Sequence, residues 1–402
     1  MHSYTEETIQ TLTPLEGIRK RLSMYTGSAD NDSLHHAIKE AISNSIDEFL
    51  AGYGDVIEVD LDVEKNSIRI RDYGRGIPFN KIVDVSTIPH SGGKFTKEGS
   101  AYGASSGLNG TGMKILTATG TNTVTSIRDG VACSYTFDYT TVGERKEAKT
   151  KEKNGTIVEW IPDTDVVVDG NTLYLDKIKQ LLEDFAYPTP GLTFVLSQNG
   201  KEIQQYRTNS INDFLANGME EKARLSAIMP FKTGNDYLMV EGALVWANAP
   251  TIEKSYLNLV PTVEGGTHIT ALRTVLTREL NKCIGSDLKG EEIRKGMSFI
   301  LSVKTLEDPI FAGQQKNKVN MPTLNAPLSK LLTEEIVLLI EKNKEFFASL
   351  EEIISKERKK EAAVAQVRQV LAKAKSKANP LPQKLKPALN KQGAELFVCE
   401  GE

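Results

Sequence analysis

Three glycine-bearing words follow one another in the first 160 residues, and they limit the possible folds more than any other feature. They are DYGRG at 72–76, GLNGTG at 107–112 and GT at 155–156. Apolar alternation predicts strands at 56–62 and 67–71, so the first word follows a strand. The second word runs into a segment that predicts a helix. Glycine lets backbone turn sharply or approach a ligand closely, so we predict an α+β fold with functional loops between its elements.

Apolar spacing predicts further elements along the rest of the chain. We expect helices at 34–51, 174–186, 210–217 and 268–283, and strands at 122–139, 155–161, 192–207, 238–247 and 297–304. A helical pattern then runs from Leu328 to about Lys377 and ends at Asn379-Pro380. Because 402 residues exceed what one core usually supports, we place a domain boundary near 218.

Cysteine usage and hydropathy exclude several classes of protein. The three cysteines, Cys133, Cys283 and Cys399, are far apart and have neither zinc-ligand nor disulfide-framework spacing. No stretch reaches the 18 or so apolar residues that a membrane span needs. We therefore expect a soluble cytoplasmic protein with no membrane partner, in the bacterial cytoplasm or, for a phage protein, in the host cytoplasm.

Charge is concentrated near the end of the chain. Residues 356–391 hold eleven Lys or Arg against two Glu, although the whole chain has a net charge of -4. This pattern is typical of a solvated helix face, and equally of a surface that binds a polyanion. Charge alone does not decide between the two.

A polar stripe marks the predicted helix at 34–51. His36, Glu40, Asn44 and Glu48 recur every four residues, with Asp47 beside them, and they border the apolar face. A solvated stripe is the plain interpretation. The functional one is a cleft in which a glutamate acts as general base and an asparagine oxygen binds Mg²⁺.

The glycine words supply complementary chemistry. An aspartate at a strand end, such as Asp72, can accept a hydrogen bond from an adenine amino group, whereas a simple turn is the alternative interpretation of DYGRG. Backbone amides of 107–112 at a helix start can bind phosphates. The second word lacks the GK[ST] ending of a Walker loop, and it does not follow a strand as a dinucleotide fingerprint does.

In this order and spacing, the stripe and the three words resemble the four boxes of the GHKL ATPase superfamily. Flanking words are more specific: IRKRLSMYTG at 18–27, SIDE at 45–48, HSGGKF at 90–95 and EGGTH at 264–268 are similar to the bacterial gyrase B and topoisomerase IV ParE subunits. Bacterial gyrases usually have His at the position of Asn109, whereas eukaryotic and phage enzymes have Asn there, as this chain does. The resemblance spans nearly the whole chain.

The resemblance implies a GHKL (Bergerat) α/β sandwich at 1–217 and a ribosomal S5-like α/β transducer domain with a long C-terminal helix at 218–378. A linker at 379–394 and the start of a truncated TOPRIM domain at 395–402 would follow. In that last segment Glu400 would bind Mg²⁺ only in a completed domain. The N-terminal arm would contact the partner subunit and its nucleotide through Tyr4 and Ile9, although a frayed tail is the alternative.

The resemblance also implies a role for each site residue. Glu40 would be the general base, with His36 as its orienting partner unless that histidine is incidental, and Asn44 would bind Mg²⁺. Lys316, in the word FAGQQK, would contact the γ-phosphate, and Gln315 departs from the Gln-Thr-Lys of most relatives. The other residues expected to bind ATP are Asp47, Glu48, Asp72, Gly74, Arg75, Gly76, Ile77, Pro78, Lys94, Tyr102, Gly107, Leu108, Asn109, Gly110, Thr111, Gly112, Thr156 and Gln314.

The implied function is the ATP-hydrolysing region of a type IIA DNA topoisomerase. ATP and Mg²⁺ would be its cofactors. Its partners would be double-stranded DNA, a second copy of the chain joined through the ATPase domain, and a breakage-reunion subunit of the gyrase A or ParC type. A MutL-like repair ATPase and a low-turnover ATP-dependent DNA clamp are the alternatives, and the EGGTH and RKRLSMYTG words disfavour the first.

Overall fold

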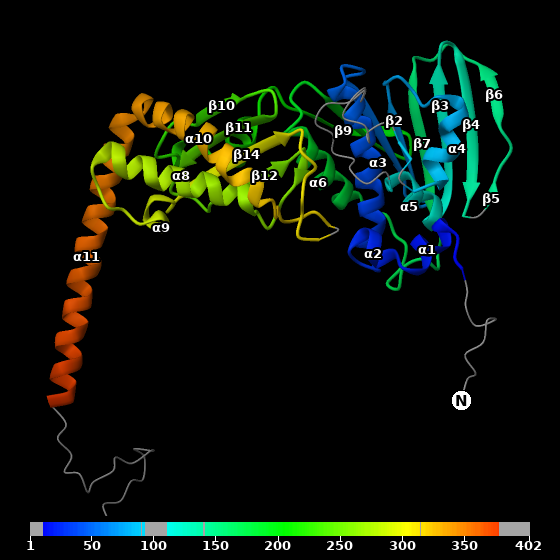
Figure 1. The fold of residues 1–402 in the computed structure, drawn as a ribbon. Helices are drawn as coiled ribbons and strands as arrows, with labels where there is room; N and C mark the ends of the chain where they lie inside the picture. Colours follow the sequence, from blue (N-terminus) through cyan, green and yellow to red (C-terminus); the bar gives the residue numbers. More distant parts are fainter. Residues whose placement is uncertain (1–10, 90, 93–110, 140, 314, 378–402) are drawn as a thin grey trace, which may run out of the picture. The chain divides into compact units, whose positions relative to one another are not determined.

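The computed structural model describes residues 11–89, 91–92, 111–139, 141–313 and 315–377. The chain divides into two compact units, Met1–Lys344 and Glu345–Glu402. Both β-sheets lie in the first unit (Figure 1).

The N-terminal sheet has nine strands among the described residues, ordered β5-β4-β3-β7-β2-β1-β8-β9, with β6 paired to β4. Its only parallel pair there is β1 with β8. The strands are β1 Val56–Asp62, β2 Ser67–Asp72, β3 Gly120–Arg128, β4 Val131–Asp138, β5 Thr141–Val142, β6 Lys146–Lys149, β7 Gly155–Pro162, β8 Thr193–Gln198 and β9 Lys201–Arg207.

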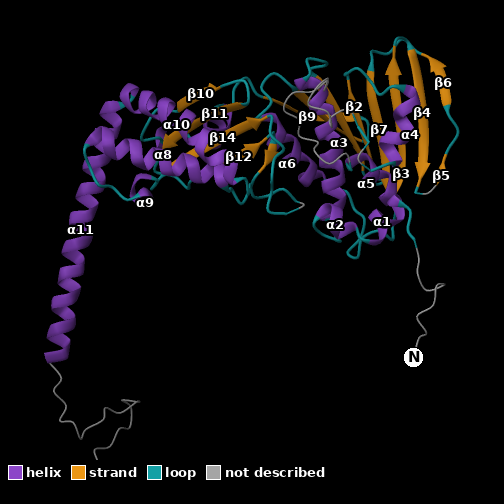
Figure 2. Ribbon diagram, viewed as in Figure 1, coloured by secondary structure: helices purple, strands orange, loops and turns teal. Residues whose placement is uncertain are grey.

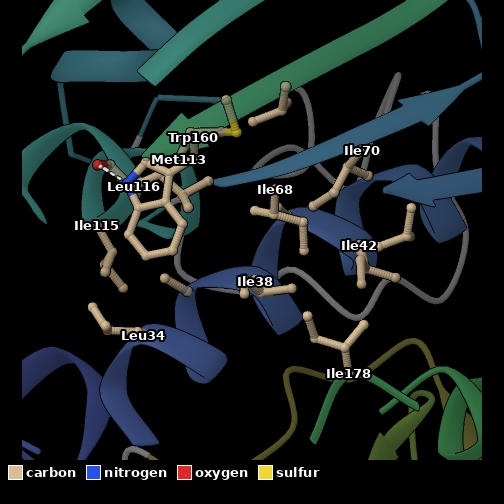
Figure 3. Packing of buried hydrophobic residues seen from close by; sticks show 14 of the residues in the cluster. Leu34, Ile38, Ile42, Ile68, Ile70, Met113, Ile115, Leu116, Trp160 and Ile178 are labelled. Atoms are coloured by element: carbon tan, nitrogen blue, oxygen red, sulfur yellow. Dashed lines mark hydrogen bonds between the residues drawn. The ribbon is translucent and has the colours of Figure 1, made fainter. Parts of the chain in front are cut away.

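Helices α3, α5 and α6 pack against this sheet (Figure 2). Ile38 and Ile42 of α3 face Ile68 and Ile70 of β2, and the Trp160 indole donates a hydrogen bond to the Leu116 carbonyl (Figure 3). The helices of this region are α1 Pro14–Lys20, α2 Leu22–Thr26, α3 Asp32–Leu50, α4 Ile82–Thr87, α5 Gly112–Thr119 and α6 Leu175–Ala186. The apolar face predicted for 34–51 is thus the buried face of α3.

Local chemistry explains where the first helices begin and end. The Thr13 hydroxyl accepts from the Glu16 amide and the Glu16 carboxylate accepts from the Thr13 amide, which forms a capping box at the start of α1. Gly27 ends α2 in the left-handed conformation, with φ +83°. The word MYTG is therefore a helix end.

The second sheet has five strands in the described part of the chain, ordered β10-β11-β14-β12-β13. Its elements are β10 Met229–Gly234, β11 Leu238–Trp246, β12 Glu253–Leu257, β13 Val260–Pro261 and β14 Met297–Thr305, with α7 Asp213–Gly218, α8 Thr267–Ile284, α9 Gly290–Ile293 and α10 Pro322–Lys342. Helices α8 and α10 pack on each other, and α10 contacts β10 and β11. The predicted boundary near 218 falls between β9 and β10.

The helix predicted for the C-terminal region is confirmed, except for its start and for one break. The helical stretch expected from Leu328 to Lys377 begins six residues earlier, at Pro322, and is broken at Asn343 into α10 and α11 Lys344–Lys377. Pro327 lies inside α10, where a proline lacks a backbone donor and normally argues against a helix. The Asn343 side chain donates to the Leu339 carbonyl and so ends α10.

Candidate functional site

A cavity of about 1060 Å³ opens between α3, the end of β2 and the start of α5. Charged and amide side chains line it together with glycine backbone. The lining residues that matter below are Glu40, Asn44, Ser45, Glu48, Asp72, Gly74, Arg75, Gly76, Ile77, Pro78, Gly112, Lys114 and Thr156. Residues predicted from three separate sequence words therefore share one cavity.

Asp72, the last residue of β2, is almost fully buried in the wall of this cavity. One carboxylate oxygen accepts from the backbone amides of Gly74 at 2.9 Å and Thr156 at 3.1 Å, and the other accepts from the Ser45 hydroxyl at 3.2 Å. Burial raises the pKa of Asp72 to about 6, although the two amide bonds oppose this shift. The carboxylate is held rigidly and retains acceptor capacity toward the cavity.

Gly155 is required by the approach of β7 to this aspartate. Its φ is +146°, and a Cβ there would lie 2.1 Å from the Asp72 carbonyl oxygen. No other residue fits without displacing the backbone. The word GT thus brings the Thr156 amide to Asp72.

Glu48 holds the DYGRG loop against α3. Its carboxylate accepts from the Arg75 backbone amide at 2.9 Å and from the Arg75 guanidinium at 3.0 Å through each oxygen. The same guanidinium lies 4.6 Å from the Tyr53 ring centroid. A bidentate pair of this kind fixes geometry, so Glu48 serves here to position the loop.

Glu40 lies at the other end of the polar stripe, where it pairs with Lys316. The Lys316 ammonium donates to the Glu40 carboxylate at 2.9 Å, and the two side chains are only 7% and 13% exposed. Burial raises the pKa of Glu40, but the charge and hydrogen bond of Lys316, with further contributions from His36 and Lys39, together outweigh burial and hold the pKa at about 2. Glu40 is therefore an ionised carboxylate that forms an ion pair with Lys316.

His36 lies one turn before Glu40 on α3. Its Nε2 is 3.8 Å from the same Glu40 oxygen that Lys316 contacts. Burial lowers the pKa of His36 to about 4, although Glu40 opposes this shift, so the ring is neutral at pH 7. At 3.8 Å the imidazole is too far from the carboxylate for a hydrogen bond, so the orienting role of His36 stays a prediction.

Two family models match the chain. One, described as histidine kinase-, DNA gyrase B- and HSP90-like ATPase, covers residues 29–165, and the other, DNA gyrase B, covers residues 210–370. The B subunit of DNA topoisomerase 4 from Bacillus subtilis is 32% identical over 99% of this chain and 65% of its own length. The DNA gyrase B subunit from Thermotoga maritima is 29% identical over 100% of this chain and 68% of its own length.

The chain belongs to the DNA gyrase B family. It spans about two thirds of the length of these two relatives. Among solved structures, the 43K ATPase domain of Thermus thermophilus gyrase B has the same fold, with a TM-score of 0.70 and 24% identity over 89% of this chain and 98% of that one. The ATPase and transducer domains of a topoisomerase II from Balamuthia mandrillaris also match, with a TM-score of 0.66 and 18% identity over 89% of this chain and 100% of that one.

Most of the predicted site residues that the structure describes meet at the cavity. Asn44, Ile77, Pro78, Gly76 and Gly112 line it, and α5 begins at Gly112 as predicted. A Cβ at Gly112 would lie 2.8 Å from the Glu40 Cβ, so this glycine lets α5 start against the predicted base.

Four of the predicted residues that the structure describes do not line the cavity, and His36 is one of them. Asp47 is buried away from its surface. Lys316 does not line it either, because its ammonium donates a hydrogen bond to the Glu40 carboxylate. Thr111, the residue before α5, is described but does not line the cavity. Ten predictions lie outside the described residues, namely Tyr4, Ile9, Lys94, Tyr102, Gly107, Leu108, Asn109, Gly110, Gln314 and Glu400.

Sequence reasoning missed Ser45 and Lys39. Ser45 follows Asn44 on α3 and carries the hydroxyl bond to Asp72, which only knowledge of the fold reveals. Lys39 is a partly buried lysine beside Glu40, and burial together with the charge of Lys316 lowers its pKa to about 8. The only sequence signal for Lys39 is its position directly before Glu40, the predicted base.

The described part of the chain contains no helix of the length and apolarity that crossing a membrane requires.

Proposed function

We propose that this chain binds ATP in the cavity and hydrolyses it, as the ATPase region of a type IIA DNA topoisomerase. The observation that carries the proposal is that Asp72, Asn44 and Glu40 line one cavity. The rigid Asp72 carboxylate is an acceptor for the adenine amino group. Glu40, beyond Asn44 on the same helix, is an ionised base for the attacking water.

Phosphate and metal binding fit the groups between these two ends. The first turn of α5 has backbone amides that the helix itself does not use, and such amides favour an anion. The Asn44 amide supplies the oxygen that Mg²⁺ prefers, with phosphate oxygens and water as further ligands. Bound there, Mg²⁺ would neutralise charge on the phosphates.

We infer that Lys316 takes two positions, one on Glu40 and one on the γ-phosphate. In the structure its ammonium neutralises Glu40. A γ-phosphate beside Glu40 carries more negative charge and competes for the ammonium. Transfer of Lys316 to the phosphate would release Glu40 to orient water and accept its proton. Hydrolysis and contact with the transducer domain would then be coupled.

Replacing Lys316 by Met tests this coupling. The change keeps the side-chain length and removes the charge, so we expect ATP turnover to fall roughly tenfold, the effect of about 1.4 kcal/mol in the transition state. ATP affinity should change less. Steady-state kinetics and calorimetry measure the two effects, with Lys318→Met, an exposed lysine two residues further on, as the matched control. Equal losses in affinity and turnover would indicate a ground-state contact only.

The broader proposal is an ATP-driven gate. Two copies of the chain would associate through the ATPase domain when ATP binds, enclose a double-stranded DNA segment, and reopen after hydrolysis. DNA cleavage would require a breakage-reunion partner of the gyrase A or ParC type. ATPase activity measured against protein concentration, with and without duplex DNA, tests this scheme. Turnover that is independent of both would contradict it.

The basic helix α11 offers a test of DNA binding. Lys359, Lys360 and Arg368 are exposed on it. If they neutralise phosphates, replacing all three by Gln should lower the slope of log affinity against log salt by up to about three units, because each lost contact removes about 0.9. Fluorescence anisotropy with duplex DNA at several salt concentrations measures the slope.

A matched control removes the same charge elsewhere. Lys146, Lys149 and Lys151 are exposed near the β6 edge, and replacing them by Gln should leave the slope unchanged. An unchanged slope in the α11 variant would mean that α11 is only a solvated helix.

A further inference from the structure

The loop that carries Lys316, described at residues 312–313 and 315–318, is anchored on the second domain. The Ala312 amide donates to the Lys318 carbonyl at 2.9 Å and closes the loop. The Glu264 amide donates to the Asn317 carbonyl at 3.0 Å, and Val319 pairs with Gly265. The base of this Lys316 loop is thus part of the transducer fold, whereas the tip reaches the first domain.

Two adjacent residues of the tip meet two different helices of the first domain. Lys316 contacts Glu40 on α3. The Gln315 side chain lies directly over Gly27, the residue that ends α2. A Cβ at Gly27 would be 2.3 Å from the Gln315 Cγ, so the absence of a side chain at position 27 creates the space that Gln315 occupies. The Gln315 amide oxygen also accepts from the Asn317 side chain at 3.1 Å, within the loop.

The backbone conformation of Lys316 is unfavourable, so contacts of the loop must stabilise it. Its φ is +60°, a left-handed value that costs a residue other than glycine about 1–2 kcal/mol. Its ammonium also approaches a second cation, Lys39. The ion pair with Glu40 opposes both costs, and the contact of Gln315 with Gly27 fixes the neighbouring residue.

We propose that Gln315 is a positioning residue, which holds the Lys316 loop on the first domain through Gly27 and so places Lys316 on Glu40. The role in hydrolysis rests on the function proposed above. The placement itself does not, and it is measurable without nucleotide.

The test uses the reactivity of the Lys316 amine in the full chain without nucleotide. The buried ammonium of Lys316 should react slowly with an acetylating N-hydroxysuccinimide ester, and exposed Lys318 in the same peptide region is the internal reference. Mass spectrometry gives both rates. We expect Gln315→Ala to raise the rate of Lys316 relative to Lys318 roughly three- to tenfold, the usual scale for a lost packing contact. Gln315→Met, which keeps the chain over Gly27, should restore most of the protection.

A double-mutant cycle tests whether Gln315 acts through its contact with Gly27. Gly27→Ala should raise Lys316 reactivity as Gln315→Ala does, and the double variant should be no more reactive than the stronger single variant. Gly200→Ala is the matched control for backbone strain, because Gly200 has a similar φ of +76° and a Cβ there meets nothing within 4 Å. It should leave the reactivity unchanged. Unaltered Lys316 reactivity in Gln315→Ala, or fully additive effects of the two changes, would overturn the proposal.

ATP kinetics separate this proposal from the proposed function. Gln315→Ala should lower kcat roughly three- to tenfold with KM nearly unchanged. A wild-type chain without ATPase activity would refute the proposed function and leave the reactivity result as evidence for the placement. An active wild type whose Gln315→Ala variant exposes Lys316 but keeps full kcat would refute the positioning role in catalysis.

Discussion

Replacing Glu40 by Ala is expected to lower ATP turnover by roughly 10²- to 10⁴-fold, the usual contribution of a general base. The carboxylate is ionised and lies at the cavity wall, and the neutral His36 ring is 3.8 Å away. Without it, no other acidic side chain lies on the stripe between His36 and Asn44. Turnover is measured by a coupled assay at saturating ATP, and nucleotide affinity by calorimetry.

The control for this substitution follows from the Lys316 pair. Alanine leaves the Lys316 ammonium buried without its partner, which costs stability. Glu40→Gln keeps an oxygen that accepts from Lys316 but cannot take a proton from water. We expect it to fold and bind ATP like the wild type and to lose as much turnover as Glu40→Ala. Near-normal turnover in Glu40→Gln would exclude Glu40 as the base, whatever the alanine variant shows.

The elements around the site were predictable because their patterns are local. The polar stripe of α3 and the alternation in β1 are periodic over seven or more residues. The shorter alternation in β2 is bounded by turns. Short elements without such a period, among them α2, β5 and β13, were not predicted. The start of α10 was misplaced because Pro327 carries a strong local signal that tertiary packing overrides.

The contacts of the site were less predictable than its residues. Asp72, Asn44 and Glu40 could be chosen from sequence because their words match a known order. The Glu40–Lys316 pair joins residues 276 positions apart, and the contact of Gln315 with Gly27 joins two domains. Neither has a periodic signal, since both depend on how one domain packs against the other. For the same reason the sequence alone does not explain why Gln315 replaces the threonine of most relatives, whereas its contact with Gly27 does.

Asp72→Asn is expected to weaken ATP binding by about 1.5–3 kcal/mol, the range for a hydrogen bond to a charged group. The Asn oxygen can keep the amide bonds from Gly74 and Thr156. Its nitrogen then replaces the oxygen that faces Ser45 and the cavity, so a donor would meet the adenine amino group. Calorimetric titration measures the loss, and unchanged affinity would place the adenine elsewhere.

Stability and pH dependence distinguish this role of Asp72 from a structural one. Because burial raises the pKa of Asp72 to about 6, the folded protein binds this proton more tightly than the unfolded chain does. Its contribution to stability is present below pH 4 and is lost as pH rises through 6, so at pH 7 the ionised carboxylate costs on the order of 3 kcal/mol. Asp72→Asn removes that charge and should leave the melting temperature at pH 7 unchanged or higher.

ATP affinity should move in the opposite direction with pH. Adenine needs the ionised Asp72 as an acceptor, so wild-type affinity should fall as pH decreases through about 6, and the Asn variant should lack this dependence. ATP itself titrates in this range, but equally for both proteins, so the ratio of their affinities isolates Asp72. We expect that ratio to approach one by pH 5. A ratio that stays constant from pH 8 to pH 5 would mean that the Asp72 carboxylate does not bind the base.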